Sequence, residues 1–337
     1  MIRRDLLKAG VGLALAATML GATPAQAQDK PKDDVTLMLN WYLYSEHAPF
    51  FLGKKLGYYA EEGINLDIQE GRGSAVTAQA VAAKSVNFGY IDVTTMIKAA
   101  AKGAPLISTG VLFQVSPMSV MGFEEKGIKT PQDIVGKTVA VTPGDSMSQM
   151  WPIFLKANKI DPAQIKIVSG DAQTKLNAVM TGRADMLLGY VMDQAIKLQD
   201  ATGKPVHPIR FADSGVNQIS SGIIVNKDWL AEHGDLTRRF MRASTRAVEA
   251  AEKDPQAAVD AMLEAKPKAG VSDTLLVGLK RSIELYHTPE TKGQPPFRVA
   301  MDNVDKSLDL LVEFGGVEPA QRGKPADYVT LDYLPKN

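Results

Sequence analysis

The chain has 337 residues, of which 45% are hydrophobic, and it contains 38 basic and 38 acidic side chains. This length allows two domains, each with a core of its own. The zero formal net charge argues against a nucleic-acid-binding protein, because neutralising phosphates requires a surplus of Lys and Arg. The sequence contains no cysteine, which excludes disulfides, thiolate metal sites and cysteine nucleophiles.

The first 27 residues show the order of segments that is typical of a signal peptide. Basic residues at Arg3, Arg4 and Lys8 precede an apolar run over residues 9–22, and Ala25-Gln26-Ala27 supplies small residues for cleavage. We therefore expect cleavage after Ala27 and export to the periplasm. The pair Arg3-Arg4 resembles a twin-arginine export signal, so the general and the twin-arginine routes both stay open, as does a membrane-tethered N-terminal helix.

From residue 35 onward, short apolar strands alternate with amphipathic helices. Alternation of this kind predicts an α/β fold with mostly parallel sheets flanked by helices, and two such series predict two lobes. The predicted strands cover residues 35–39, 64–68, 88–91, 106–113, 138–141, 165–169, 186–189 and 221–225. The predicted helices cover residues 48–59, 74–83, 96–101, 146–156, 175–181 and 236–252, with a further one starting at Asp254-Pro255.

The sequence lacks the common signatures of catalysis. Its histidines (His47, His207, His233 and His287) lie far apart, and no P-loop, nucleophile elbow or GxGxxG fingerprint is present. We therefore expect no catalytic residue, no metal site and no cofactor. A triad assembled from distant segments stays open, because such residues meet only in the fold.

The loop after the first predicted strand is rich in groups that can hold a planar ligand. It contains Asn40, Trp41, Tyr44 and His47. Aromatic rings offer flat apolar faces, and the polar atoms beside them fix a ligand's orientation. The alternative role for Trp41 is a core residue that seals the sheet.

Further candidate site residues lie at the ends of other predicted strands, because ligands of open α/β sheets bind beyond the carboxyl ends of the strands. Glycine and serine at two strand-to-helix turns allow close approach or donate to an anionic group, although ordinary helix capping explains them equally well. These candidates are Arg72, Gly73 and Ser74 at one turn, and Gly144, Asp145 and Ser146 at the other. Short connections at residues 116–117 and 213–215 are expected to act as hinges between the lobes. The remaining candidates lie at strand ends, in the helix after the second turn or beside these hinges, and are Asp92, Gln114, Ser116, Trp151, Tyr190, Asp193 and Ser221.

Four segments together resemble a known family. They are Leu39-Asn40-Trp41, the stretch from His47-Ala48 to Gly63-Ile64, Gly127-Ile128 through Gly136-Lys137, and Gly182-Arg183-Ala184-Asp185. They are similar to the periplasmic substrate-binding components of ABC importers for nitrate, sulfonate, taurine and thiamine-pyrimidine precursors, the NMT1/THI5-like family. The resemblance implies the two-lobed periplasmic binding protein fold of type II, with residues 28–116 and 219–337 in lobe 1 and residues 117–218 in lobe 2.

The chain departs from the enzymes that share this fold. The resemblance extends to pyrimidine synthases with an active-site histidine, a lysine-bound pyridoxal phosphate and a cysteine-rich iron-site run. The nearest positions here are Thr95, Ile91 and Ile219-Ser220-Ser221-Gly222, so we expect a protein that is not an enzyme. The acidic ligand contact of pyrimidine-binding relatives falls nearest Val191, two residues before Asp193.

The sequence thus predicts the solute-binding component of an ABC-type importer. Its ligand is expected to be a planar or aromatic nutrient, pyrimidine-like or an aromatic acid, that lies between the lobes of a monomer and passes to a membrane permease. A binder of a sulfonate, taurine or nitrate anion is an alternative, for which Arg72 is the one obvious cation. Two further alternatives are an exported enzyme related to the pyrimidine synthases and a periplasmic sensor.

Overall fold

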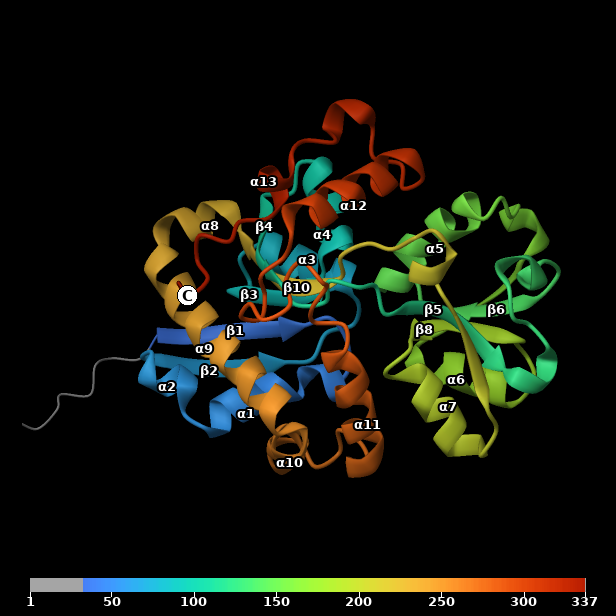
Figure 1. The fold of residues 1–337 in the computed structure, drawn as a ribbon, viewed down its shortest axis with the longest axis horizontal. Helices are drawn as coiled ribbons and strands as arrows, with labels where there is room; N and C mark the ends of the chain where they lie inside the picture. Colours follow the sequence, from blue (N-terminus) through green and yellow to red (C-terminus); the bar gives the residue numbers. More distant parts are fainter. Residues whose placement is uncertain (1–32, 337) are drawn as a thin grey trace, which may run out of the picture. The chain divides into compact units, whose positions relative to one another are not determined.

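The computed structural model describes residues 33–336, so the expected signal peptide lies outside the described residues. The described chain forms two five-stranded sheets (Figure 1). The first has the order β2-β1-β3-β10-β4 and consists of β1 (Asp33–Leu39), β2 (Ile64–Gln69), β3 (Phe88–Asp92), β4 (Leu106–Val111) and β10 (Ser221–Asn226). The second has the order β7-β6-β8-β5-β9 and consists of β5 (Met118–Phe123), β6 (Thr138–Val141), β7 (Lys166–Ser169), β8 (Met186–Tyr190) and β9 (Val206–Arg210).

Each sheet is mostly parallel, as the sequence predicts. Strand β10 runs antiparallel to its neighbours β3 and β4, and β5 runs antiparallel to β8 and β9. The other strands of each sheet share one direction, so their carboxyl ends meet at one edge. The chain crosses from the first sheet to the second over residues 112–117 and returns over residues 211–220, next to the predicted lobe boundaries.

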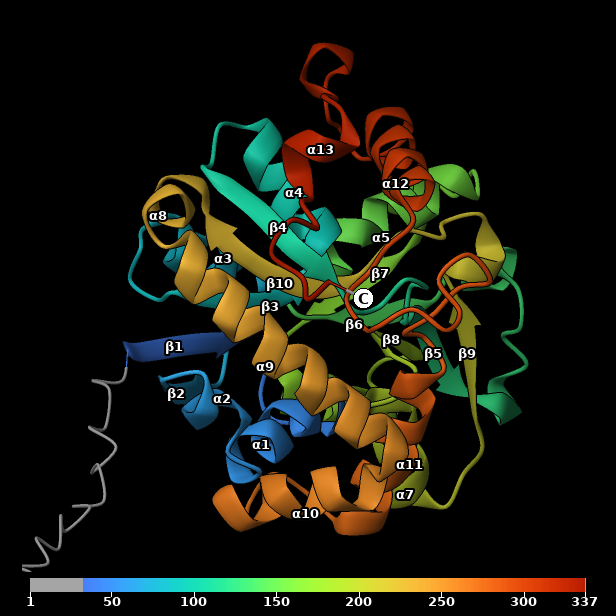
Figure 2. The same cartoon turned by 60° about the vertical axis from the view of Figure 1, so that its left-hand side comes forward.

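Helices cover both sheets. Those that follow strands of the first sheet are α1 (Ala48–Lys55), α2 (Tyr58–Glu61), α3 (Ser74–Ala82) and α4 (Val93–Ala101), and those of the second are α5 (Ser146–Ala157), α6 (Ala172–Met180) and α7 (Gln194–Thr202). The helices after β10 are α8 (Lys227–Glu232), α9 (Gly234–Lys253), α10 (Pro255–Ala265), α11 (Ser272–Ile283), α12 (Met301–Glu313) and α13 (Pro325–Tyr328). Figure 2 shows the long α9 running across the first sheet's side of the molecule beside α1.

The structure differs from the predicted elements at a few points. The helix expected over residues 48–59 breaks into α1 and α2 at Gly57, which adopts a left-handed φ of 78° that favours glycine. Strands β5 and β9 and helix α7 were not predicted, whereas α11 and α12 agree with the expectation, made without bounds, that helices follow the strand at 221–225 to the C-terminus. In β5 every residue is buried, so it lacks the alternation of buried and exposed positions by which a strand is recognised.

One face of α9, the helix predicted over residues 236–252, forms part of the core. Leu236, Phe240, Ala243 and Ala247 are all buried, and Phe240 stacks on Phe88 of β3 with ring centroids 3.9 Å apart. Within residues 33–336 no helix has the length and apolar character that crossing a membrane requires.

Candidate functional site

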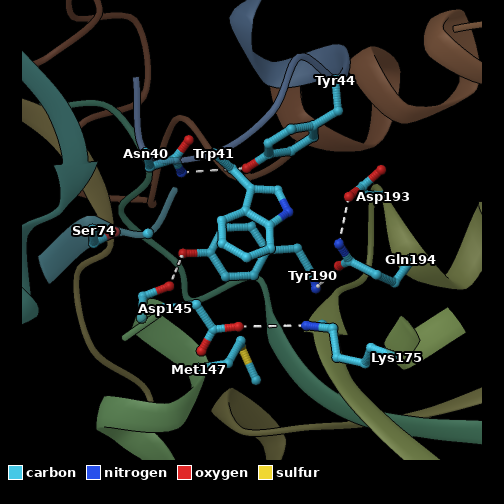
Figure 3. Close-up of a pocket in the computed structure, with 13 residues that line it drawn as sticks. Asn40, Trp41, Tyr44, Ser74, Asp145, Met147, Lys175, Tyr190, Asp193 and Gln194 are labelled. Atoms are coloured by element: carbon cyan, nitrogen blue, oxygen red, sulfur yellow. Dashed lines mark hydrogen bonds and ion pairs between the residues drawn. The ribbon is translucent and has the colours of Figure 1, made fainter. Parts of the chain in front are cut away.

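A pocket lies where strand ends of the two sheets meet (Figure 3). Its volume is about 30 Å³, which is room for about one or two water molecules, whereas small-molecule sites usually hold about 300–1,000 Å³. The pocket is therefore closed in this structure. Its lining consists of Asn40, Trp41, Tyr44, Gly73, Ser74, Asp145, Ser146, Met147, Lys175, Gly189, Tyr190, Asp193 and Gln194.

The amide of Asn40 is fixed by buried neighbours in the loop after β1. Its Nδ2 donates to Glu46 Oε1 at 2.7 Å and, more weakly, to Tyr44 Oη at 3.4 Å, while its Oδ1 lies 2.7 Å from His47 Nε2. Glu46 and His47 are fully buried, with 3.5 Å between Glu46 Oε1 and His47 Nε2. The loop thus presents Asn40 to the pocket in one orientation.

Two glycines let the turn after β2 approach the pocket. A Cβ on Gly71 would lie 1.9 Å from Leu39 O, and one on Gly73, which has φ 131°, would lie 2.6 Å from Gly144 O. Gly73 N donates to Asn40 O at 2.8 Å. Because no side chain fits here, the backbone of this turn contacts the first-sheet loop on one side and the second-sheet turn on the other.

The second-sheet wall is organised by the start of α5. Asp145 caps the helix by accepting from Ser148 N at 2.7 Å, as the sequence allows, and Ser146 Oγ lies 2.9 Å from Tyr190 Oη. Ser74 is not a side-chain cap of α3: its Oγ accepts from Asp92 N at 3.2 Å.

Charges in the pocket lining are paired. Lys175 Nζ lies 3.4 Å from Asp145 Oδ2 and 5.7 Å from the centre of the Trp41 ring. Asp193 lies 2.8 Å from Lys197 Nζ and also accepts hydrogen bonds from Tyr42 and Gln194. The charged groups of the lining are therefore balanced when Lys197, which lies outside the lining, is included.

The phenols of the lining are hydrogen-bonding groups and carry no charge near neutral pH. Burial raises the pKa of Tyr44 and of Tyr190 well above the ordinary value, and the carboxylate of Glu46 contributes to both shifts. Neutral phenols next to a ligand can both donate and accept.

Contacts outside the pocket also join elements of the two sheets. Tyr42 in the β1 loop donates to Asp193, Ser45 Oγ donates to Met192 O at 3.4 Å, and Thr274 Oγ1 in α11 donates to Asp200 at 2.6 Å. A Cβ on Gly278 would lie 2.5 Å from Met192 O, so α11 packs against the β8–α7 turn only because this position is glycine. These contacts join the two sheets in the closed arrangement.

Some residues predicted for the site lie outside the pocket lining. His47 is buried behind Asn40, and Arg72 is exposed, since the backbone of its turn occupies the side towards the pocket. Asp92 caps α4 and accepts from Thr94, Thr95 and Ser220. The N–H of Gly144 is used within its own turn, where it donates to Ser148 Oγ.

The remaining predicted residues serve packing or the crossings. Gln114 donates to the carbonyl oxygens of Tyr286 and Arg298, and Ser116 lies buried in the outgoing crossing, with Met118 N donating to its Oγ. Trp151 stacks on Phe154 and Phe211 in the core, with centroid distances of 5.4 and 6.3 Å. Ser221 is fully buried in β10 next to Asp92 in register.

Four lining residues were not among the predicted site residues: Met147, Lys175, Gly189 and Gln194. Gly189 and Gln194 flank predicted residues at the β8 end. Lys175 lies one turn into α6, after the β7 strand end, and the same strand-end rule that found Asp145 applies to this junction.

Among residues 33–336, no group of three or more His, Asp or Glu side chains is placed to hold a metal ion. The resemblance places the cofactor-bearing lysine of the synthases nearest Ile91, which is a fully buried residue of β3 without an amine. That position does not fit a lysine-bound pyridoxal phosphate.

The comparisons with known proteins agree with the family resemblance. A family model described as NMT1/THI5 like matches residues 44–258, which is more than half of the chain. A 4-amino-5-hydroxymethyl-2-methylpyrimidine phosphate synthase of Legionella pneumophila is 27% identical over 285 residues, which cover 84% of this chain and 86% of that protein. A riboflavin-binding protein of Chloroflexus aurantiacus is 26% identical over 76% of this chain and 73% of its own, and a formylaminopyrimidine-binding protein of Halalkalibacterium halodurans is 24% identical over 77% and 79%.

Solved structures show the fold. The alkanesulfonate-binding protein of Xanthomonas axonopodis pv. citri, bound to MOPS, has a TM-score of 0.67 at 13% identity and covers 88% of this chain and 98% of its own. The periplasmic nitrate-binding protein of Synechocystis PCC 6803 has a TM-score of 0.65 at 12% identity over 90% and 87%. The predicted periplasmic binding protein fold is confirmed.

The prediction that the chain is not an enzyme is wrong. Besides the Legionella protein, relatives from Uromyces fabae and Aspergillus parasiticus, among others, are named as the same pyrimidine phosphate synthase. The relatives include named enzymes as well as named binding proteins, so the departures at Thr95 and Ile91 were not sufficient grounds for that prediction.

Proposed function

Because the chain belongs to the NMT1/THI5 like family, we propose that it binds a small planar heterocycle in the pocket between its two sheets and delivers it to an ABC-type permease from the periplasm. The named binding relatives support this ligand class, since one is called a riboflavin-binding and another a formylaminopyrimidine-binding protein. The sheets would act as the two predicted lobes, with crossings 112–117 and 211–220 as hinges.

The observation that carries the proposal is the chemistry of the lining. Trp41, Tyr44 and Tyr190 supply aromatic surface, and Asn40 and Ser146 supply polar atoms beside it. A compact anion such as nitrate or a sulfonate needs several donors and an unpaired positive charge. In the described lining the one cation, Lys175, is already paired with Asp145, and Arg72 is exposed elsewhere, so the lining favours an uncharged aromatic ligand over an anion.

Binding requires the pocket to open. A cavity of about 30 Å³ has no room for a ring system, so the closed form must separate at the contacts between the sheets, admit the ligand and close again. A permease that binds only the closed, ligand-loaded form would then distinguish it from the open, empty form.

Thermal unfolding and tryptophan fluorescence test the proposal. The protein would be screened against pyrimidines, riboflavin, aromatic acids, alkanesulfonates and nitrate, and a ligand at 100 times its Kd should stabilise it by about 2.7 kcal/mol. Trp41→Ala should weaken binding about tenfold, roughly 1.4 kcal/mol, whereas Trp229→Phe, in α8, should leave both affinity and the fluorescence change intact. Stabilisation by inorganic anions and sulfonates alone would overturn the proposal.

A second candidate is the synthesis of the pyrimidine named in the relatives. Its support is the Legionella synthase, which matches 84% of this chain. The test is growth of a strain that lacks its own 4-amino-5-hydroxymethyl-2-methylpyrimidine phosphate synthase and expresses this chain without residues 1–27. Growth of that strain without added pyrimidine would favour synthesis, whereas growth at low, otherwise limiting pyrimidine only when the full chain with residues 1–27 is expressed would favour binding and delivery.

A further inference from the structure

Lys175 is a buried cation whose hydrogen-bonding capacity is mostly unused. Its side chain is 2% exposed, and among residues 33–336 its one hydrogen-bond acceptor is Asp145 Oδ2, at the long distance of 3.4 Å. An ammonium group has three donors. Two donors of a buried charge therefore lack acceptors, at a position that lines the pocket.

The partner carboxylate is also only partly used. Asp145 Oδ1 accepts from Ser148 N at 2.7 Å, whereas Oδ2 accepts from Lys175 alone. Figure 3 shows the two side chains facing each other across one end of the pocket, next to Trp41. The pair thus offers a donor and an acceptor, a few ångströms apart, beside an aromatic surface.

Charge balance restricts what this pair can receive. Asp193 is neutralised by Lys197 at 2.8 Å, which leaves Lys175 and Asp145 balanced against each other. A buried anion would pair with Lys175 but face Asp145, and a cation would have the opposite conflict. A neutral group that carries an acceptor next to a donor satisfies both without adding charge.

We propose that Lys175 and Asp145 select a ligand with a lactam or imide edge, in which a ring carbonyl accepts from Lys175 Nζ and the adjacent ring N–H donates to Asp145 Oδ2. This inference rests on the proposed function, since it defines the ligand class of the same pocket. Trp41 lies against the flat face of the ring, and the Lys175–Asp145 pair forms hydrogen bonds with its edge. Rings without that edge leave the free donors of Lys175 or the free acceptor of Asp145 Oδ2 without a partner in the buried pocket, which weakens their binding.

The test uses four probes of one ring size, measured by calorimetry on the protein without residues 1–27. Uracil has the imide edge, 1,3-dimethyluracil has it blocked, benzoate offers only acceptors and benzamidine only donors. We expect uracil to bind at least tenfold more tightly than each of the other three. Lys175→Met and Asp145→Asn should each weaken uracil binding at least tenfold, while Lys204→Met, which removes an exposed ion pair with Glu125, should change nothing.

The substitutions are chosen so that the variants still fold. Asparagine caps helices as well as aspartate does, so Asp145→Asn retains the start of α5. The double variant Lys175→Met/Asp145→Asn leaves no uncompensated charge, and it should bind uracil and 1,3-dimethyluracil with equal affinity.

The outcomes separate this inference from the proposed function. Tightest binding of benzoate, with Asp145→Asn strengthening it, or tightest binding of benzamidine would overturn the lactam assignment while leaving an aromatic ligand in place. Equal binding of uracil and 1,3-dimethyluracil to the unaltered protein would do the same. If none of the four binds, and the wider screen yields an aromatic ligand without this edge, the inference fails alone; if that screen yields only inorganic anions and sulfonates, the proposed function fails with it.

Discussion

His47 Nε2 lies 2.7 Å from Asn40 Oδ1, and both residues are buried. Asn40 lines the pocket, but His47 lies behind it, so His47 acts on the ligand only by fixing the Asn40 amide. We predict that His47→Ala raises the Kd of the ligand found in the screen by about tenfold, since a buried hydrogen bond is removed that is worth about 1–3 kcal/mol. Isothermal titration measures the effect.

Rescue distinguishes positioning from a loss of fold. His47→Gln retains a donor that can reach Asn40 Oδ1 and should restore most of the affinity, and His207→Ala, in β9, is the control for loss of a histidine outside the site. Unchanged affinity in a folded His47→Ala protein would show that the Asn40 orientation does not depend on this contact.

Tyr42 links the loop after β1 to the β8–α7 turn through its hydrogen bond to Asp193. Because the pocket is closed, a contact that joins the two sheets opposes entry of the ligand. We predict that Tyr42→Phe increases the association rate about fivefold. Loss of a hydrogen bond worth about 1 kcal/mol raises the population of the open form by about this factor. Stopped-flow tryptophan fluorescence measures this rate. Tyr58→Phe, in α2, should have no effect, and an association rate for Tyr42→Phe equal to the unaltered one would rule out Tyr42 as a closing contact.

Trp151 and Trp41 follow equivalent junctions but should respond differently to substitution. Trp151 is 7% exposed and stacks on Phe154 and Phe211. We predict that Trp151→Ala lowers the free energy of unfolding by about 3–5 kcal/mol, as loss of a large buried side chain does, with a ligand Kd within about twofold. Denaturant unfolding and titration measure the two quantities. If the Trp151→Ala protein folds but binds the ligand more weakly, Trp151 contributes to the ligand site and is not only a core residue.

The sequence predicts the part of the site that follows from strand direction. Asn40, Ser74, Asp145 and Tyr190 come from separate segments, yet they line one pocket because the carboxyl ends of parallel strands share an edge. The alternation of strands and helices in the sequence was sufficient to place these four residues.

Side-chain direction could not be predicted in the same way. A lysine in an amphipathic helix normally faces water, so nothing in the α6 sequence indicates that Lys175 is buried against Asp145. Arg72 is the opposite case, since glycines on both sides bring the backbone to the pocket and leave the side chain exposed. Both outcomes depend on packing between the two sheets, which no local pattern records.

Asp92 provides a test of pH dependence. Burial raises its pKa above the ordinary value, against the opposing effect of hydrogen bonds from Thr94, Thr95 and Ser220. The folded state therefore binds this proton more tightly than the unfolded state, and the resulting contribution to stability falls as pH rises from about 4, the unfolded pKa, through the folded pKa. Asp92→Asn should abolish this contribution, so the unaltered protein should lose stability relative to the variant across that window.

Asp133 supplies a control of opposite sign. Hydrogen bonds from the Lys129 and Thr130 amides lower its pKa, so its contribution to stability is present above the unfolded pKa and is lost as pH falls. Thermal melts of both asparagine variants between about pH 3 and 7 should give difference curves of opposite slope, with the smaller slope for exposed Asp133. Since Asp92 is fully buried at the start of α4 and its Oδ2 accepts from Ser220 of the returning crossing, parallel curves for Asp92→Asn and the unaltered protein would show that these hydrogen bonds offset its burial completely.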